Sequence, residues 1–355
     1  MNGILGVTII VVNYNNGNFL SAAIDSALAQ DHVLCEVVVV DDCSTDNSLE
    51  IINSYGERIR SVVRDTNGHQ IVAINSAWPI AAYPILIFLD SDDVLSSRAA
   101  AAVAQRWTEK TVKAQFLLAS IDETGYPLDH IFPKYPQTIN TAIIRAQLLN
   151  TAQSPSSPAS GNAYSRRLLE KITEDGGFEL ENPREYWMDN ILECNAPFYG
   201  EVVTIHEPLA YYRIHDGNHT LQKTIDHKRF EHACEKFLLK ANYLEERCRF
   251  WGIPFDRAAA CNGSLWLLEC RLAAAKLAPD PAVTRVGTLG SLWRALRACT
   301  QAPLGLPRRV IFAAWCVGVV VTPRAAARRI IALRFVVTQR PRWLERLFRK
   351  RSIAR

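Results

Sequence analysis

Several features that mark other protein classes are missing from this sequence of 355 residues. There is no CxxC pair and no Cys/His cluster with zinc spacing, because the nine cysteines are scattered along the chain. An odd, scattered set favours reduced thiols over a disulfide framework. The N-terminus has no basic stretch followed by a long apolar one and a small-residue cleavage site, so we expect no secretory signal. These absences indicate a protein of the cytoplasm.

An uncharged run that is long enough to cross a membrane is also missing. Residues 310–323 form a run of fourteen uncharged residues between two arginines. A spanning helix needs roughly twenty. Apolar residues interleaved with arginine are typical of a segment that lies on a membrane surface. The alternative is a core helix with a solvated basic face, and insertion into the membrane stays open.

Acidic residues are scarce in the C-terminal part of the chain. From residue 284 onward there are sixteen Lys and Arg and one acid, Glu345, whereas the rest has 24 bases and 35 acids. This split indicates an acidic domain whose basic tail meets an anionic surface. Membrane lipid and nucleic acid are the candidates, and the apolar run favours lipid. We therefore expect no nucleic-acid partner and a peripheral position on the inner face of the cell membrane.

Strand and helix patterns alternate through the first hundred residues. Short apolar runs predict buried strands over 7–14, 35–42, 58–65 and 84–90. Helical patterns predict helices over 18–30, 44–56, 68–82 (with interference from Pro79) and 96–107. Alternation with all-apolar strands predicts an α/β fold with a mostly parallel sheet covered on both faces.

The pattern loosens after residue 110. It predicts a strand over 112–122, a Pro/Ser-rich loop over 151–161, helices near 165–172 and 185–195, and two strand-like runs before residue 215. From about residue 224 the pattern is helical. We therefore expect an α/β domain over residues 1–220 and a helical, basic region over 221–355.

Polar residues gather where the predicted strands end. Asn13–Asn15 follow the first strand, Asp41 and Asp42 the second, and Asp90–Asp93 the fourth. In parallel sheets ligands bind outside the carboxyl ends of the strands. Alternate acids there can hold Mg²⁺ or Mn²⁺ through oxygen, and the cation can bridge phosphates. The plainer alternative is a helix start, where Asp is favoured in any case.

Three stretches in this order and spacing resemble the family 2 glycosyltransferases with a GT-A fold: "TIIVVNYNNGNFLSAAIDSALAQ", "VVVVDDCSTDNS" and "IFLDSDD". The resemblance covers roughly residues 6–220. It implies a Rossmann-like nucleotide-sugar-binding domain and inverting transfer of a sugar from a nucleotide diphosphate. The Gln-x-x-Arg-Trp motif and the membrane spans of processive synthases are absent, which favours addition of a single sugar.

The resemblance also implies roles for the residues at the strand ends. Asn13, Tyr14, Asn15, Asp41 and Asp42 would hold the base, with Asp42 accepting from the uracil N3–H and Tyr14 stacking on the ring. A carboxylate reads an imide N–H well, which favours UDP, although dTDP shares the imide.

The Asp-x-Asp motif of the family matches Asp90 and Asp92. Asp90 would bind the ribose and Asp92 the metal, with Asp93 as a further metal ligand or an acceptor-side group. The cation would neutralise the departing diphosphate.

The family's general base matches Asp189, in "EYWMDNILECNA". An inverting reaction needs one base to deprotonate the acceptor hydroxyl. The family has Glu before this Asp, whereas this chain has Met188, so Glu185 is an alternative base. Trp187 beside it would stack on an acceptor sugar or pack in the core.

The remaining matches lie in three other segments. In "YYRIHDGNHT", Arg213 would reach the diphosphate and His215 the metal, while His219 stays unassigned. Asn75 matches a family position for the nucleotide sugar, although Ile74 replaces a common arginine there. Gly161 would let the backbone approach the acceptor.

The partners that follow are a nucleotide-sugar donor and a glycan or lipid-linked acceptor in surface polysaccharide synthesis. A nucleotidyltransferase should carry a basic loop after the first strand, and "NYNNGNF" has no Lys or Arg. A noncatalytic nucleotide-sugar-binding scaffold remains an alternative because of Met188.

Overall fold

The computed structural model describes residues 5–31, 33–215, 217–218, 225–279, 281–301 and 305–335, without the side chains of 281–288 and 301. His219 and the basic stretch after residue 335 lie outside this range. The chain divides into two compact units. The first holds Met1–Leu149, Gln153–Asp216 and Tyr243–Pro254, and the second holds Asn150–Ala152, Gly217–Asn242 and Phe255–Arg355. The expected domain boundary after residue 220 remains a prediction.

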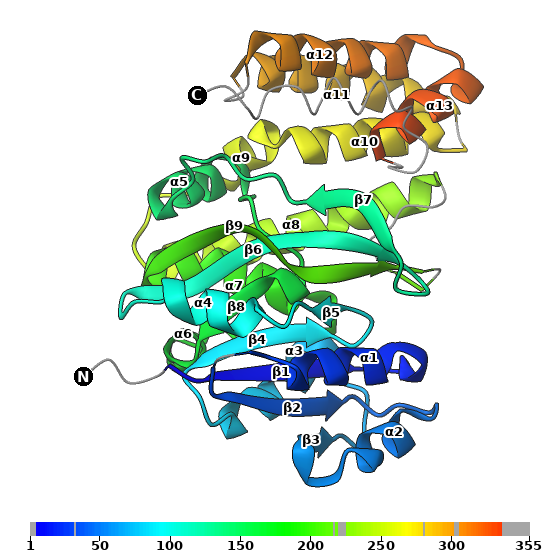
Figure 1. Cartoon of the computed structure of the whole chain (residues 1–355). Helices are drawn as coiled ribbons and strands as arrows, with labels where there is room; N and C mark the ends of the chain where they lie inside the picture. The colour runs from blue at the N-terminus through cyan, green and yellow to red at the C-terminus, as the bar shows by residue number, and fades with distance from the viewer. Residues whose placement is uncertain are drawn as a thin grey trace. The chain divides into compact units, whose positions relative to one another are not determined.

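The first unit begins with the predicted alternation of strands and helices (Figure 1). Its first elements are β1 Val7–Asn13, α1 Gly17–Leu28, β2 Cys35–Asp41, α2 Ser48–Ser54, β3 Arg60–Val63, α3 His69–Ala77 and β4 Ile85–Asp90. Every element predicted up to residue 90 is present; most are shorter than predicted, and α1 begins one residue earlier, at Gly17. The predicted helix 68–82 stops at Ala77 because Pro79 cannot donate a backbone hydrogen bond, and Trp78–Ile80 form a 3₁₀ turn instead.

The later elements of this unit are β5 Val94–Leu95, α4 Ala99–Arg106, β6 Thr111–Asp122, β7 Pro127–Phe132, α5 Thr141–Thr151, β8 Asn162–Ser165, α6 Arg166–Glu174, α7 Met188–Tyr199 and β9 Glu201–Ile214. Of these, β5, β7, α5 and β8 were not predicted by the sequence pattern. β9 corrects the expectation of two strands, because both predicted runs belong to one continuous strand. The hairpin strand β7 was missed because it is mostly exposed and lacks an apolar run.

The strands form one sheet in the order β3-β2-β1-β4-β8-β6-β9-β5, with β7 paired to β6. The pairs β2–β3, β1–β2 and β1–β4 are parallel, as predicted, whereas β8 is antiparallel to β4. The parallel register brings Asn13 beside Asp41 and places Val12 beside Asp90. The carboxyl ends of β1, β2 and β4 therefore meet at one edge, where the predicted polar residues lie.

Both faces of the sheet are covered, since alternate strand residues pack into different cores. Val7, Ile9 and Val11 of β1 belong to a cluster that includes residues of α1, α2 and α4. Ile10 of the same strand is also buried but lies outside that cluster. Side chains of a strand alternate between its two faces. This double burial explains why β1 reads as a continuous apolar run.

The second unit is helical. α8 His227–Phe250 begins in it, and α9 Arg257–Gly263, α10 Leu265–Leu277, α11 Pro281–Gln301, α12 Leu306–Val321 and α13 Arg324–Phe335 follow. Phe230, Leu268, Leu272, Val319 and Ile331 lie at the centre of its core. Among the helices that the structure describes, none is both long and apolar enough to span a bilayer.

Candidate active site

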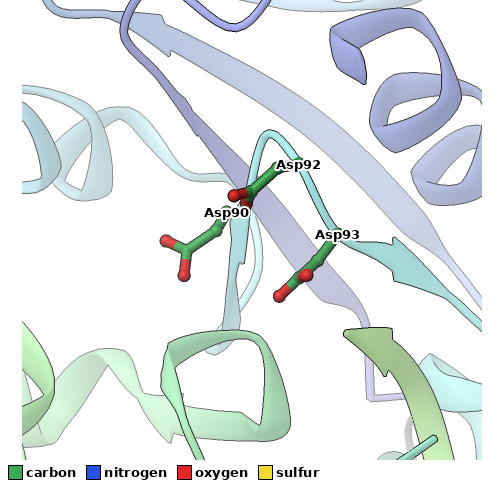
Figure 2. Close-up of side chains that lie close together, drawn as sticks. All are labelled: Asp90, Asp92 and Asp93. Carbon is green, nitrogen blue, oxygen red and sulfur yellow. The ribbon is translucent and has the colours of Figure 1, made fainter. Parts of the chain in front are cut away.

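Three carboxylates lie together on the turn after β4 (Figure 2). Asp90 ends the strand, and Asp92 and Asp93 follow before β5 begins. One oxygen from each carboxylate lies within 4.8 Å of the other two. The turn is fixed by backbone hydrogen bonds, because Ser91 N donates to Val12 O at 3.1 Å and Asp93 N donates to Asp90 O at 3.0 Å. The structure thus brings together the predicted Asp-x-Asp motif and the acid after it.

The surroundings of Asp90 and Asp93 oppose the ionisation of both carboxyl groups. Burial, followed by the charges of Asp92 and Asp90, raises the pKa of Asp93 well above its usual range. Burial, followed by the charges of Asp92 and Asp189, raises the pKa of Asp90 to about 8. Like charges that share a buried site oppose ionisation. A cation at this position would relieve both effects.

The donor set fits a hard divalent cation. Oδ1 of Asp93 accepts a hydrogen bond from Arg213 N at 3.0 Å. Within the described part of the chain its buried Oδ2 has no hydrogen bond of normal geometry, and the Ser160 hydroxyl is the only other donor near this carboxylate. Buried polar atoms normally have a partner. Carboxylate oxygens are the ligands that Mg²⁺ and Mn²⁺ prefer. Asp90, Asp92 and Asp93 are therefore suited to hold such an ion.

His215 reaches this cluster from the end of β9. Its Nε2 lies 3.0 Å from Oδ2 of Asp92, and the side chain is buried. The Phe19 ring packs against the imidazole with a centroid distance of 4.7 Å. The structure thus places the predicted metal ligand His215 next to the predicted metal ligand Asp92.

Arg213 contacts the same turn mainly through carbonyl groups. Its Nε donates to Asp92 O at 2.9 Å, and its guanidinium also donates to Glu123 O at 3.1 Å and to Asp122 O at 3.4 Å. The guanidinium lies over the Phe19 ring, 5.1 Å from its centre. These contacts tie the carboxylate turn to the β6–β7 hairpin, and binding of a diphosphate by Arg213 stays a prediction.

The ends of β1 and β2 are joined by a hydrogen-bonded network around Asp41. Its carboxylate accepts from Asn13 Nδ2 at 2.8 Å, from Ser44 N at 2.8 Å and from Ser44 Oγ at 2.6 Å. Asp41 is fully buried, and Asn13 nearly so. These contacts explain the local shape of the loop, whereas direct base contacts by Asn13 and Asp41 stay predictions.

Asp42 is held in the same way by the segment after β3. Its Oδ1 accepts from Arg64 Nε at 2.8 Å and from Gly68 N at 2.9 Å. The side chain of Asp42 is nearly buried. Both carboxylate oxygens have protein donors, since Gly68 N also lies 3.1 Å from Oδ2. The predicted contact with a uracil N3–H therefore needs a lone pair that these donors leave open.

The loops at this edge carry backbone strain. Of the four described non-glycine residues with positive φ, three follow successive strands: Asn15 at 52°, Cys43 at 68° and His69 at 63°. Such conformations are costly and gather at functional sites. Asn15 is locked by Thr45 N, which donates to its Oδ1 at 2.7 Å, whereas the Tyr14 ring beside it is half exposed and open to stacking.

Asp189 lies in the first turn of α7, and its charge is one of the causes of the raised pKa of Asp90. The two segments are linked by Gln70 of α3, which the sequence pattern did not single out. Its Oε1 accepts from Met188 N at 3.1 Å, and its Nε2 donates to Asp90 Oδ1 at 3.4 Å. No local motif could have revealed this bridge, because Met188 lies 118 residues further along the chain.

A small pocket lies between α3, β4, β8 and α7. It is lined by Gln70, Ile74, Phe88, Ala159, Tyr164, Met188, Asp189 and Leu192. The buried hydroxyl of Tyr164 has no hydrogen-bond partner within the described chain. Met188, at the position where the family has Glu, makes part of this wall apolar.

The remaining predicted residues have varied surroundings. A side chain at the buried Gly161 would collide with Ser157 and Leu118, so packing alone explains this glycine. Oδ1 of Asn75 accepts from Trp78 Nε1 at 3.1 Å. Trp187 is 37% exposed, directly before α7. The sugar-binding roles of Gly161, Asn75 and Trp187 stay predictions.

Comparison with known families and proteins gives a consistent result. The family model described as "Glycosyl transferase family 2" matches residues 8–173. An uncharacterized glycosyltransferase of Nostoc sp. is 34% identical over 219 residues, which is 60% of this chain and 66% of that protein. The succinoglycan biosynthesis protein ExoO of Rhizobium meliloti is 39% identical over 90 residues, 25% of this chain and 26% of that protein. The chain thus spans less than two thirds of these relatives.

Among solved structures, the S. aureus TarS fragment 1–349, in complex with UDP-GlcNAc, is similar with a TM-score of 0.53. The alignment covers 93% of this chain and 91% of that one at 15% identity. At this identity the likeness shows a shared fold, and it agrees with the predicted GT-A class.

Proposed function

The chain belongs to glycosyltransferase family 2, and from this membership we propose that it transfers a single sugar, with inversion, from a nucleotide diphosphate sugar to an acceptor. The observation that carries the proposal is the carboxylate cluster at the end of β4 with Asp189 close by. A site for a cation and a candidate base therefore lie on neighbouring segments, as this chemistry requires.

In the proposed mechanism, Asp92, Asp93 and His215 would hold the divalent cation, and Asp90 beside them would bind the ribose. When bound, Mn²⁺ or Mg²⁺ would neutralise the diphosphate that leaves. Tyr14 would stack on the base, and the network around Asn13, Asn15, Asp41 and Asp42 would shape its pocket. The chain's own residues thereby orient the donor.

Asp189 would take the proton of the acceptor hydroxyl as that oxygen attacks the sugar. Its place at the first turn of α7 is favourable for a carboxylate because the helix dipole stabilises negative charge there. Glu185 is exposed and accepts from Asn182 Nδ2 at 2.8 Å, so Asp189 is the better candidate. The hydrogen bonds of Gln70 to Met188 N and to Asp90 would hold the base and the cation site at a fixed distance from each other.

We take UDP as the favoured nucleotide and a glycan or lipid-linked oligosaccharide of a surface polysaccharide as the acceptor. The first rests on the carboxylates after β2, and the second on the similarity to a succinoglycan biosynthesis protein. The arginine-rich C-terminal region supports a peripheral position at the inner face of the cell membrane, where lipid-linked acceptors are presented.

The test is nucleotide release from a panel of nucleotide sugars, with Mn²⁺, with Mg²⁺ and with EDTA. We expect metal-dependent turnover of one donor that falls by at least about 100-fold in Asp92→Asn. The matched control is Glu109→Gln, which neutralises an exposed acid on a turn outside the site. Binding of a donor without turnover, with or without acceptor, would favour the noncatalytic scaffold instead.

A further inference from the structure

One face of α12 leaves an apolar stripe exposed. Leu306, Val310, Ala314, Val317 and Val321 recur at helical spacing, and we call them the α12 stripe. Leu306 is 74% exposed, Val310 58%, Val317 38% and Val321 70%, and Ala314 is exposed too. The opposite face is packed, since Cys316 and Val319 are buried in the core of the second unit. α12 thus has two apolar faces: one is buried in the core of the second unit, and the other is exposed to solvent.

The neighbouring helix α11 repeats this feature. Leu289 and Trp293, one helical turn apart, are 65% and 62% exposed. The guanidinium of Arg297, one further turn along, lies 5.5 Å from the centre of the Trp293 ring. Tryptophan with a nearby cation is typical of the interface between lipid and water.

The charge on these helices has a single sign. No Asp or Glu occurs between residues 284 and 335. Among the side chains that the structure describes in this segment, the exposed charged ones are all arginines: Arg294, Arg297, Arg308, Arg324, Arg328 and Arg329. Arginine near an anionic leaflet contributes to binding through the surface potential. A surface that combines exposed apolar groups with arginine alone complements anionic lipid.

We propose that α11 and α12 dock on an anionic membrane surface, with the α12 stripe and Trp293 entering the headgroup region and the arginines contacting lipid phosphates. α12 has 16 residues, too few to cross a hydrocarbon core that needs about twenty, so it lies in the plane of the surface. A second copy is a poorer occupant, because a two-fold interface would place arginines against arginines without an acid to neutralise them. Nucleic acid leaves the apolar stripe unexplained.

The test is cosedimentation of the full chain with vesicles of phosphatidylcholine, with and without phosphatidylglycerol, at low and high salt. We expect binding that needs the anionic lipid and weakens with salt. Val310→Asp combined with Val317→Asp should reduce binding by at least about tenfold, as should Arg294→Glu combined with Arg308→Glu. The matched control is Tyr126→Asp, which places the same charge at a 70% exposed aromatic position of the first unit.

Thermal unfolding and circular dichroism of each variant show whether the fold is intact. Because these positions are exposed, we expect unchanged unfolding midpoints. The proposal is overturned if the α12 variants bind anionic vesicles like the original chain, or if binding ignores lipid charge. It is also overturned if the chain binds single-stranded DNA but no vesicles, or if it forms a dimer that the α12 variants dissociate while no lipid binds. None of these readouts depends on sugar transfer, so failure here would remove the proposed membrane position and leave the proposed sugar transfer intact.

Discussion

The two units differ in the partners of their buried acids. In the first, Asp90, Asp92 and Asp93 share one turn, and the pKa values of Asp90 and Asp93 are raised by burial and by the neighbouring charges. In the second, the carboxylate of Glu269 is 2% exposed and receives two hydrogen bonds from Arg334, at 3.1 and 3.0 Å. The buried Glu269 is paired with an arginine, which is typical of a structural role. The Asp90, Asp92 and Asp93 cluster, with raised pKa values, is typical of a site that binds a ligand.

The largest expected effect comes from neutralising the cluster. Asp93→Asn should reduce metal-dependent turnover by at least about 100-fold. The same change should stabilise the fold by about 1 kcal/mol near pH 8, because the raised pKa of the Asp93 carboxyl costs stability at a pH where the unfolded chain is ionised, and an amide has no such cost. Nucleotide release measures the first effect, and chemical denaturation without metal measures the second.

The stability gained by Asp93→Asn should depend on pH. When the pKa of a carboxyl group is higher in the folded than in the unfolded state, the free energy of unfolding falls as pH rises from the unfolded pKa to the folded one. The pKa of Asp93 is raised. The gain from Asp93→Asn should therefore grow with pH, and Glu109→Gln should show no such trend. A variant less stable than the original chain at high pH would contradict the contrast between the units.

The second prediction breaks the pair in the helical unit. Arg334→Met should destabilise the fold by about 3–5 kcal/mol, because it leaves Glu269 buried without a partner. Burial raises the pKa of Glu269, and Arg334 opposes that rise, so the variant should raise it further. The loss of stability should therefore grow as pH rises above the ordinary value of 4.5. Chemical denaturation over a pH series measures both.

Two further variants control for the loss of the arginine itself. Arg329→Met changes an exposed position of the same helix and should stay within about 0.5 kcal/mol of the original chain. Replacing both Glu269 and Arg334 by Met should recover most of the loss, since an apolar pair needs no partner. If the double variant is no more stable than Arg334→Met, the buried charge is not the cause.

The third prediction concerns Gln70, which joins the two halves of the site. Gln70→Leu removes the hydrogen bonds to Met188 N and Asp90 while keeping a similar volume. We expect kcat to fall about tenfold with a smaller change in donor KM, and stability to fall by about 1 kcal/mol. Steady-state kinetics with a fixed acceptor measures the split.

Gln70→Glu separates positioning from simple stability. Its carboxylate still accepts from Met188 N but places another negative charge near Asp90. Stability should therefore recover more than kcat does. If both variants keep the original kcat, Gln70 supports the fold alone.

Which parts of the fold and of the candidate site could be predicted from the sequence depends on how far apart in the chain the interacting residues are. The strands and the acids at their ends could be predicted, because buried parallel strands read as apolar runs and their ends meet at one edge. Asp189 and His215 came only from the family resemblance. The Gln70 bridge, and the use of Arg213 to hold the turn by its carbonyl groups, depend on segments that are distant in sequence and could not be predicted. The α12 stripe needed the structure too, since only packing shows which apolar face is left exposed.

The last prediction concerns a change of metal affinity with pH. The pKa of Asp90 is raised to about 8, so part of the cluster is protonated at neutral pH in the metal-free protein. Binding of Mn²⁺ must release that proton, and affinity should fall by up to about tenfold per pH unit below 8. Calorimetry in two buffers of different ionisation enthalpy measures the protons released, and Asp92→Asn should lower their number because Asp92 contributes to the raised pKa. If the Mn²⁺ affinity does not change with pH and binding releases no protons, the cluster is already ionised in the metal-free protein. The contrast with the paired Glu269 would then be wrong.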